Sequence, residues 1–176
     1  IRQLAKEDVK VRGIPLTMEF YDLVVFLTNS FLRPTYSELY DIKHEDIAVT
    51  NGGNTKSLTI NIRRGKTGDR ISATMEAAVN IYEQICQRYP NHESIDYIFY
   101  PETRNRRTAI RHAQRLLNYT LNEADLMTDP YTNQKHTMYS FRHTAICMRL
   151  VISKGKVNIY TLAKNAGTSV EMIENN

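Results

Sequence analysis

Residues 47–72 read IAVTNGGNTKSLTINIRRGKTGDRIS, and this region decides the fold class of the chain. Within it, Leu58 to Ile62 alternates apolar and polar residues, which is the pattern of a β-strand with one buried face. Two turn-forming stretches, NGGN at 51–54 and RGKTG at 64–68, divide the region into three parts. The region therefore predicts a three-stranded antiparallel meander. The predicted strands are 47–50, 58–62 and 70–72.

On both sides of the meander, apolar residues recur at helical spacing. Thr17 is a suitable N-cap for a helix that continues to about Thr28. Because one small sheet lies among many helices, the expected class is mainly α with a small three-stranded antiparallel sheet (α+β). Helices are predicted at about 17–28, 37–42, 74–87, 104–120, 140–151 and 157–166, and from 169 onward.

The composition is that of one globular domain with its own hydrophobic core. The 176 residues are 41% hydrophobic and 24% charged, and no apolar run reaches transmembrane length. No secretory signal pattern opens the chain, so we expect a cytoplasmic protein with no membrane contact. The chain starts without Met and stops within a helical pattern. Residues 1–176 are therefore interpreted as a single domain cut from a longer protein.

Positive charge is concentrated in one segment. Lysine and arginine number 23 against 19 acidic residues, a net charge of +4, and residues 101–120 carry +4 by themselves (five arginines less Glu102). In a helix, four of these arginines share one face, which could follow DNA phosphates. The same face could equally be a solvated surface opposite buried leucines. The four are Arg104, Arg107, Arg111 and Arg115.

Several common kinds of site lack their sequence pattern. A phosphate-binding loop ending at Gly65-Lys66-Thr67 requires a glycine at position 60, which is isoleucine. The five histidines form no HExxH pair and have no CxxC companion, so we predict no metal site. No Gly-x-Ser-x-Gly elbow indicates a hydrolase. Cys86 and Cys147 are expected to be free, buried thiols.

Three cationic residues stand at junctions between predicted elements. Arg33 precedes Pro34, which disfavours the helical conformation for Arg33 and so marks the end of a helix. Lys66 lies in a hairpin turn, from which its ammonium could reach a ligand. Arg142 lies near the start of an amphipathic helix, where an anion is favoured. Together the three could bind a phosphate.

Four motifs in this order resemble the catalytic domain of the tyrosine recombinases, or phage-type integrases. The first is Arg33 followed by Glu38-Leu39, the second is Gly65-Lys66-Thr67-Gly68, the third is Tyr139-x-x-Arg142-His143-Thr144, and the fourth is residues 162–168 (LAKNAGT). The resemblance extends over nearly the whole chain. It implies site-specific DNA recombination, with strand cleavage and rejoining through a 3′-phosphotyrosyl intermediate.

The resemblance also implies the roles of individual residues. Arg33 and Arg142 would hold the phosphate, and Lys66 would protonate the leaving 5′-oxygen. Tyr139 and Thr168 stand where the family commonly has His and His or Trp, and a phenol is a poorer base than imidazole, so His136 or His143 would compensate. The nucleophilic tyrosine is expected nine residues after Thr168, just past Asn176. This fragment would then be inactive alone.

Partners follow from the same resemblance. They are double-stranded DNA attachment sites, bound as a homotetramer when the protein is full length in a bacterial or phage-infected cell. His143, with Arg104, Arg107, Arg111 and Arg115, would contact DNA. No cofactor is implied, and the further DNA-binding domains would precede Ile1.

Alternatives stay open at the level of function and of single residues. The chain could be a catalytically silent DNA-binding relative, a type IB topoisomerase, or a regulatory helical protein with an acidic partner. Tyr139 could be a packed aromatic residue at the helix entry, Thr168 an N-cap, and His143 a core histidine. Glu38 is interpreted as a structural residue that holds a nearby cation.

Overall fold

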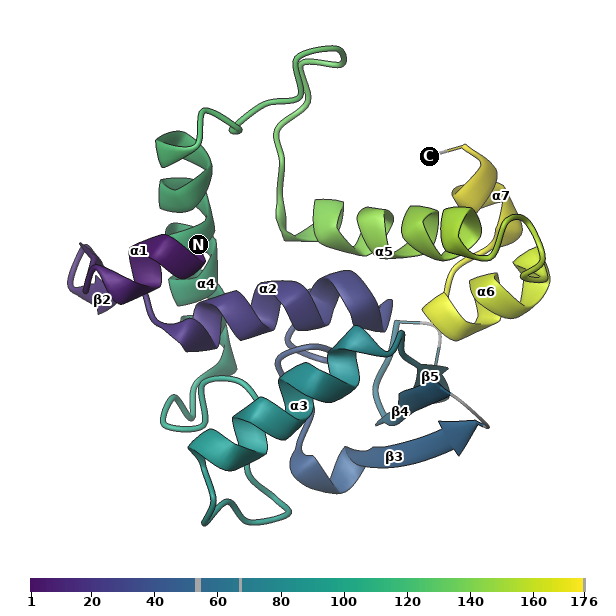
Figure 1. Cartoon of the computed structure of the whole chain (residues 1–176), viewed down its shortest axis with the longest axis horizontal. Coiled ribbons are helices and arrows are strands. Elements are labelled where there is room, and N and C mark those ends of the chain that lie inside the picture. Colours follow the sequence, from purple (N-terminus) through teal and green to yellow (C-terminus); the bar gives the residue numbers. More distant parts are fainter. Residues whose placement is uncertain (53–54, 67, 176) are drawn as a thin grey trace.

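The computed structural model describes residues 1–52, 55–66 and 68–175; the expected turn residues Gly53, Asn54 and Thr67 lie outside them. Within these ranges the chain is α+β, with seven α-helices and a small antiparallel sheet (Figure 1). In chain order the elements are α1 (Arg2–Lys6), β1 (Lys10–Val11), β2 (Ile14–Pro15), α2 (Met18–Ser30), the 3-10 helix η1 (His44–Asp46), β3 (Ile47–Gly52), β4 (Thr55–Ile62), β5 (Arg70–Ala73), α3 (Ala77–Arg88), α4 (Arg106–Glu123), α5 (Met138–Ile152), α6 (Ile159–Ala166) and α7 (Val170–Glu174).

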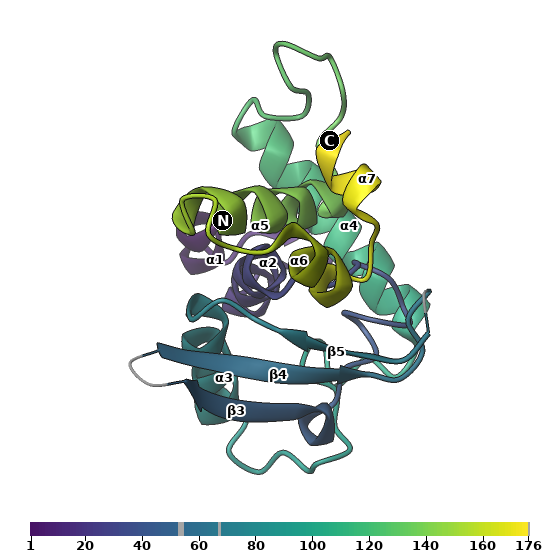
Figure 2. The same cartoon turned by 90° about the vertical axis from the view of Figure 1, so that its right-hand side faces the viewer.

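Helix α2 crosses the middle of the molecule, between α5 on one side and α3 on the other (Figures 1 and 2). Phe20, Leu23 and Phe26 are fully buried, because neighbouring elements cover the helix on several faces. The helix begins after Thr17, as predicted, and ends at Phe31, which adopts the left-handed conformation (φ 60°). The carbonyl end of α2 therefore points toward α5 and α6.

The predicted three-stranded sheet is confirmed, with the antiparallel order β3-β4-β5. In the central strand β4, Leu58, Ile60 and Ile62 are buried and the residues between them are not, which is the predicted alternation. Helix α3 packs against β4, and α6 packs against β5. Figure 2 shows β5 as the edge strand nearest α6 and β3 as the opposite edge.

The helix predicted at 37–42 is wrong. This segment is a series of turns, and Glu38 is buried there together with Leu39, Tyr40 and Ile42. The Glu38 side chain accepts a hydrogen bond from the backbone N–H of Arg33 at 2.9 Å. That bond, from a side chain to the backbone before it, favours a turn over a helix.

The β1–β2 hairpin was not predicted. Its two central residues, Arg12 and Gly13, both have positive φ (52° and 80°), as a two-residue type I′ turn requires. Arginine is an unusual residue at such a position, so the sequence carries little signal for this turn.

Two groups of buried hydrophobic residues hold the elements together. The larger joins α2, the sheet, α3 and α4. The smaller joins the end of α2 to α5 and α6, and its buried members are Phe31, Ala145, Ile146, Leu162 and Ala166. This second cluster fixes the place where three helices meet. None of the helices in the described ranges is long and apolar enough to cross a membrane.

Candidate active site

Arg33 lies just after the end of α2, and its side chain is mostly buried. Its Nη1 donates to Oε1 of Glu38 at 2.6 Å, and its Nη2 donates to the backbone carbonyl of Gly167. The expectation that Glu38 holds a nearby cation is therefore confirmed. Arg33 joins the end of α2 to the end of α6.

Arg70, the first residue of β5, holds the same carboxylate and was not singled out from the sequence. Its Nη1 and Nη2 donate to the two oxygens of Glu38 at 3.0 and 2.8 Å. Burial alone would raise the pKa of Glu38, but hydrogen bonds from Arg70 and Arg33 outweigh it, so the pKa lies below its usual value. Glu38 is therefore an ionised, fully buried carboxylate between two guanidinium groups.

Arg142 is buried in the second turn of α5. Thr137 caps this helix, since its side chain accepts a hydrogen bond from the Tyr139 N–H at 3.2 Å. The two terminal nitrogens of Arg142 donate to the carbonyls of Phe31 and Ala166. Burial and the nearby charge of Arg33 lower the pKa of Arg142 to about 10, so it is charged at neutral pH.

The C-terminus of α6 is held by all three arginines. Arg70, Arg142 and Arg33 donate to three successive carbonyls, those of Asn165, Ala166 and Gly167. These carbonyls have no partner within the helix, and the helix dipole favours cations at this end. The arginines therefore satisfy the end of α6 and are fixed by it.

One cavity of about 390 Å³ lies at this junction. It brings together six residues that the sequence analysis selected, although they come from separate parts of the chain. Three of its side chains are cationic, and none of the described residues that line it is acidic. An anion would therefore be favoured there. The six residues are Arg33, Lys66, Tyr139, Arg142, His143 and Thr168.

The exposure of these residues decides between some of the alternatives. Tyr139 is 44% exposed, so it is not a packed aromatic residue at the helix entry. His143 is exposed as well and is not a core histidine. Thr168 is not the N-cap of α7; Ser169 is, because its side chain accepts from the Met172 N–H at 3.2 Å. Tyr139 and His143 therefore line the cavity while keeping exposed surface.

Lys66 is exposed in the connection between β4 and β5 and borders the cavity. His136 does not line it. Cys147 lines the cavity and is exposed, so the expectation of a buried thiol is wrong for this residue; Cys86 is partly buried. Both thiols are free.

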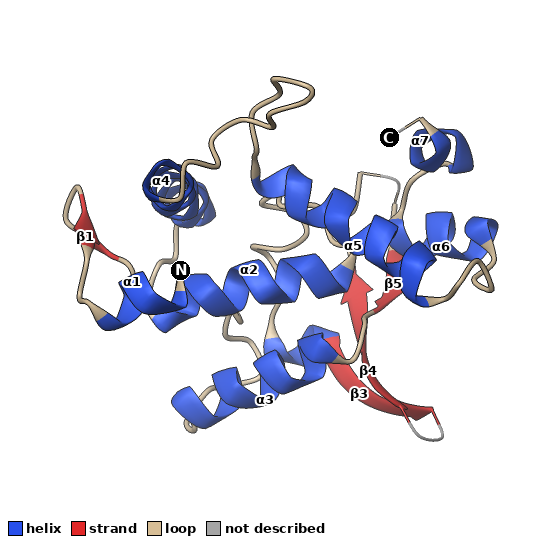
Figure 3. Cartoon of the chain, turned by 45° about the horizontal axis from the view of Figure 1, so that its top comes forward, coloured by secondary structure: helices blue, strands red, loops and turns tan. Residues whose placement is uncertain are grey.

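The predicted arginine face is only partly right. Helix α4 begins at Arg106, because the side chain of Asn105 accepts hydrogen bonds from the first backbone N–H groups; Arg104 lies before the helix. Arg107, Arg111 and Arg115 are exposed on it. Figures 1 and 3 show α4 at the opposite end of α2 from α6 and α7. The arginines of α4 therefore form a surface separate from the cavity.

Arg106 is buried and has a different role from its neighbours. Its guanidinium donates to the carbonyls of Phe99 (2.9 Å) and Tyr100 (2.7 Å), and also to those of Tyr40 and Thr103. A charged donor group that satisfies several buried carbonyls stabilises the loop before α4. Helical spacing leaves Arg106 off the face shared by the other four arginines, but nothing in the sequence indicates this role.

The described residues that line the cavity include no group of three metal-ligating side chains. Within the described part of the chain such a group exists elsewhere, formed by His44, Cys86 and His92. Comparison of the sequence and structure with models of protein families, with curated proteins and with solved structures gave no match. Function is therefore inferred from the site itself.

Proposed function

We propose that this domain binds DNA and cleaves and rejoins its strands through a phosphotyrosyl intermediate, as a tyrosine-type site-specific recombinase. The observation that carries the proposal is the cavity shared by Arg33, Lys66, Tyr139, Arg142, His143 and Thr168. These residues were selected by motif and order along the chain. Their arrangement around one cationic cavity is what such chemistry requires.

The cavity suits a phosphodiester. A phosphate that gains an attacking oxygen develops negative charge on its non-bridging oxygens, and guanidinium groups stabilise that charge. Arg33 and Arg142 are held by buried contacts, so neither needs to be ordered when DNA binds. Preorganised charge of this kind stabilises a transition state more than a mobile charge does.

The reaction balances without an external energy source. The nucleophilic tyrosine oxygen forms a bond to phosphorus as the bond to the 5′-oxygen breaks, and Lys66 gives that oxygen a proton. The tyrosine proton passes to a base, for which His143 at the cavity is the candidate. Attack by a 5′-hydroxyl reverses the steps and rejoins the strand.

The nucleophile belongs to the segment that would follow Asn176. Met172 and Ile173 of α7 line the cavity, so the helix that leads toward the expected position of the nucleophile borders the proposed phosphate site. This supports the spacing expected from Thr168. Full-length protein would act on attachment sites as a homotetramer in the cytoplasm.

A catalytically silent DNA-binding protein is the second candidate, and one observation favours it. Arg33 and Arg142 both donate to backbone carbonyls, as arginines with only a structural role would. In such a relative the cavity binds phosphate and no bond is broken.

The test uses protein extended past Asn176 along its natural sequence, with a nicked duplex that spans its attachment site. A covalent protein–DNA adduct on a denaturing gel supports the proposal. Arg142→Lys keeps the positive charge but cannot make a bidentate contact with a phosphate, so it should abolish the adduct. Arg149→Lys, an exposed arginine on the same helix, should leave it unchanged.

The remaining outcomes separate the alternatives. Binding of this duplex without an adduct would favour the silent relative. An adduct that accompanies relaxation of supercoiled plasmids lacking the site would favour a type IB topoisomerase.

A further inference from the structure

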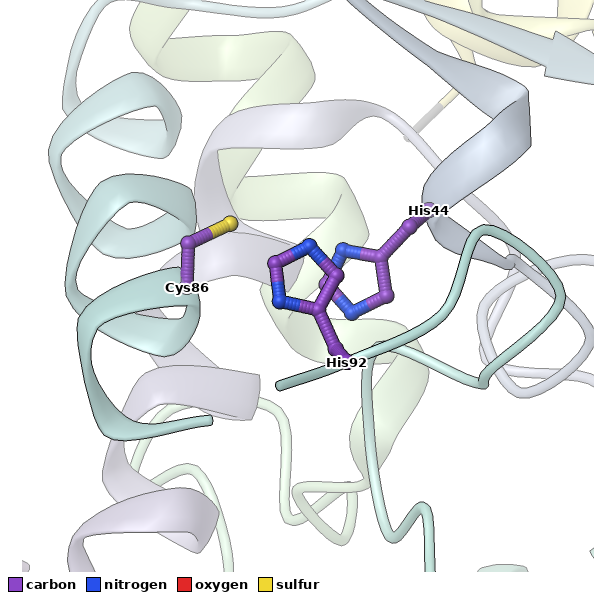
Figure 4. A group of neighbouring side chains, drawn as sticks. All are labelled: His44, Cys86 and His92. Carbon is purple, nitrogen blue, oxygen red and sulfur yellow. The ribbon is translucent and has the colours of Figure 1, made fainter. Parts of the chain in front are cut away.

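Three metal-ligating side chains converge on the side of the molecule near the carboxyl end of α3. His44 begins η1, Cys86 lies in the last turn of α3, and His92 follows that helix. One ligand atom from each lies within 4.8 Å of the other two. Figure 4 shows the thiol directed toward the two imidazoles, which lie one over the other. Their ring centroids are 3.8 Å apart.

His92 is oriented as a metal ligand. Its Nδ1 lies 2.7 Å from the backbone carbonyl of Tyr89. A carbonyl can only accept, so Nδ1 carries the hydrogen and Nε2 keeps its lone pair. Metal-bound histidines commonly donate their second N–H to a carbonyl in this way, which fixes the tautomer and the ring.

His44 also brings a ring nitrogen to the group. Its side chain is buried and stacks on the ring of His92. Its Nδ1 lies 3.1 Å from the hydroxyl of Tyr82. Figure 4 shows this nitrogen on the side of the ring that faces Cys86, so a metal bound through it would replace the hydrogen bond to Tyr82.

We propose that His44, Cys86 and His92 form a binding site for a divalent zinc ion. One thiolate and two imidazoles are a ligand set that zinc prefers. A cavity of about 280 Å³ borders both histidines, which leaves room for water as a fourth ligand. Tetrahedral coordination with bonds of about 2.0–2.3 Å places ligand atoms roughly 3.3–3.8 Å apart. The three ligand atoms would therefore move closer together by about 1 Å when zinc binds.

Zinc in this site would join three separate segments. His44 donates its backbone N–H to the carbonyl of Asp96 at 3.2 Å, and Glu45 donates to that of Ser94 at 2.8 Å. The segment after α3 already lies against η1 through these bonds. The metal would connect η1 and the segment after α3 to α3 itself. Its binding would release the thiol proton of Cys86. The proposed zinc site shares no residue with the proposed DNA-cleavage site, and the zinc proposal does not depend on that function.

The test is titration of the metal-free protein with Co²⁺, which replaces zinc and reports on its ligands. We expect one Co²⁺ per chain, with thiolate-to-cobalt charge-transfer absorption in the near ultraviolet. Cys86→Ser should lose that absorption. His92→Ala should weaken binding at least about tenfold. The matched control, Cys147→Ser, removes the other cysteine of the chain and should change neither property.

A second measurement leaves the three ligands intact. In the Cys147→Ser protein Cys86 is the single thiol, so its reaction with a thiol reagent can be followed alone. Zn²⁺ should slow this reaction at least about tenfold and raise the unfolding temperature. Absence of Co²⁺ binding, thiolate absorption that survives in Cys86→Ser, or a thiol reaction unaffected by Zn²⁺ would overturn the proposal.

Discussion

The guanidinium of Arg70 and the carboxylate of Glu38 form a bidentate ion pair, with Nη1 3.0 Å from Oε1 and Nη2 2.8 Å from Oε2. The same carboxylate accepts hydrogen bonds from the side chain and the backbone of Arg33. Glu38 therefore determines where the Arg33 guanidinium lies. In the proposed reaction, the position of a phosphate-binding group depends on a residue that does not itself line the cavity.

Replacement of Glu38 by alanine should be strongly destabilising. It leaves two largely buried arginines without their anion, and breaking a buried pair by removing one partner costs about 3–5 kcal/mol of unfolding free energy. Urea denaturation followed by circular dichroism measures the loss. Glu45, 3.3 Å from the exposed Arg63, is the matched control, because Glu45→Ala should cost under about 1 kcal/mol. Equal losses would contradict the structural role of Glu38.

Acid should weaken the fold through the same carboxylate. The pKa of Glu38 is lowered in the folded protein, so the folded state favours the ionised form. Its stabilising contribution is complete above the ordinary pKa of the unfolded chain and is lost as pH falls through the lowered folded value. The difference in unfolding free energy between wild type and Glu38→Gln should therefore stay constant from about pH 7 down to the ordinary glutamate pKa of 4.5 and shrink below it. A difference that is constant below that pKa too would show that the charge of Glu38 is not the cause.

Gly167 should not tolerate a side chain. A Cβ atom there would lie 2.7 Å from Cζ and Nε of Arg70, and the backbone has φ +64°. Gly155 provides the matched control, since its φ is +74° with nothing within 4 Å of a Cβ. Gly155→Ala should lower the unfolding free energy by about 1–2 kcal/mol, because of the backbone conformation alone. Gly167→Ala should cost about 1–3 kcal/mol more because of the steric conflict. Equal changes in urea midpoint would refute the close approach of Arg70.

Arg106 should contribute far more to stability than the arginine beside it. Arg106→Ala leaves buried carbonyls, including those of Phe99 and Tyr100, without their charged donor, and should cost about 3–4 kcal/mol. Arg107→Ala on the exposed face should stay within about 0.5 kcal/mol. Thermal unfolding of the two variants gives the comparison, and similar midpoints would exclude the buried role.

The sequence predicted the parts of the fold that depend on local pattern. Alternation at Leu58 to Ile62 and the two turn stretches defined the sheet, and helical spacing defined the long helices. The segment at 37–42 could not be assigned in this way, because the bonds of Glu38 to Arg33 and Arg70 decide its conformation. Contacts between residues 32 positions apart leave no periodic signal.

The sequence predicted which residues form the candidate site, but not which residues hold them in place. Motif order selected Arg33, Lys66 and Arg142, and their common cavity is a property of the tertiary structure. Arg70 was missed because an arginine at the start of a strand resembles any solvated residue. His44 and Cys86 were not selected as candidate metal ligands, since no short spacing connects them. Only the packing of η1 beside α3 brings these two residues together.

The exposed arginines of α4 give the last prediction, which concerns DNA. If Arg107, Arg111 and Arg115 each bind a phosphate, replacing all three by alanine should weaken binding with little dependence on DNA sequence. The slope of log affinity against log salt should become shallower by about 1 for each phosphate that is no longer neutralised. Fluorescence anisotropy with labelled duplex at several salt concentrations measures both. Lys154→Ala with Lys156→Ala, at exposed lysines after α5, controls for a general reduction of positive charge. An equal change of slope in the control, or none in the triple variant, would mean that α4 presents only a solvated face.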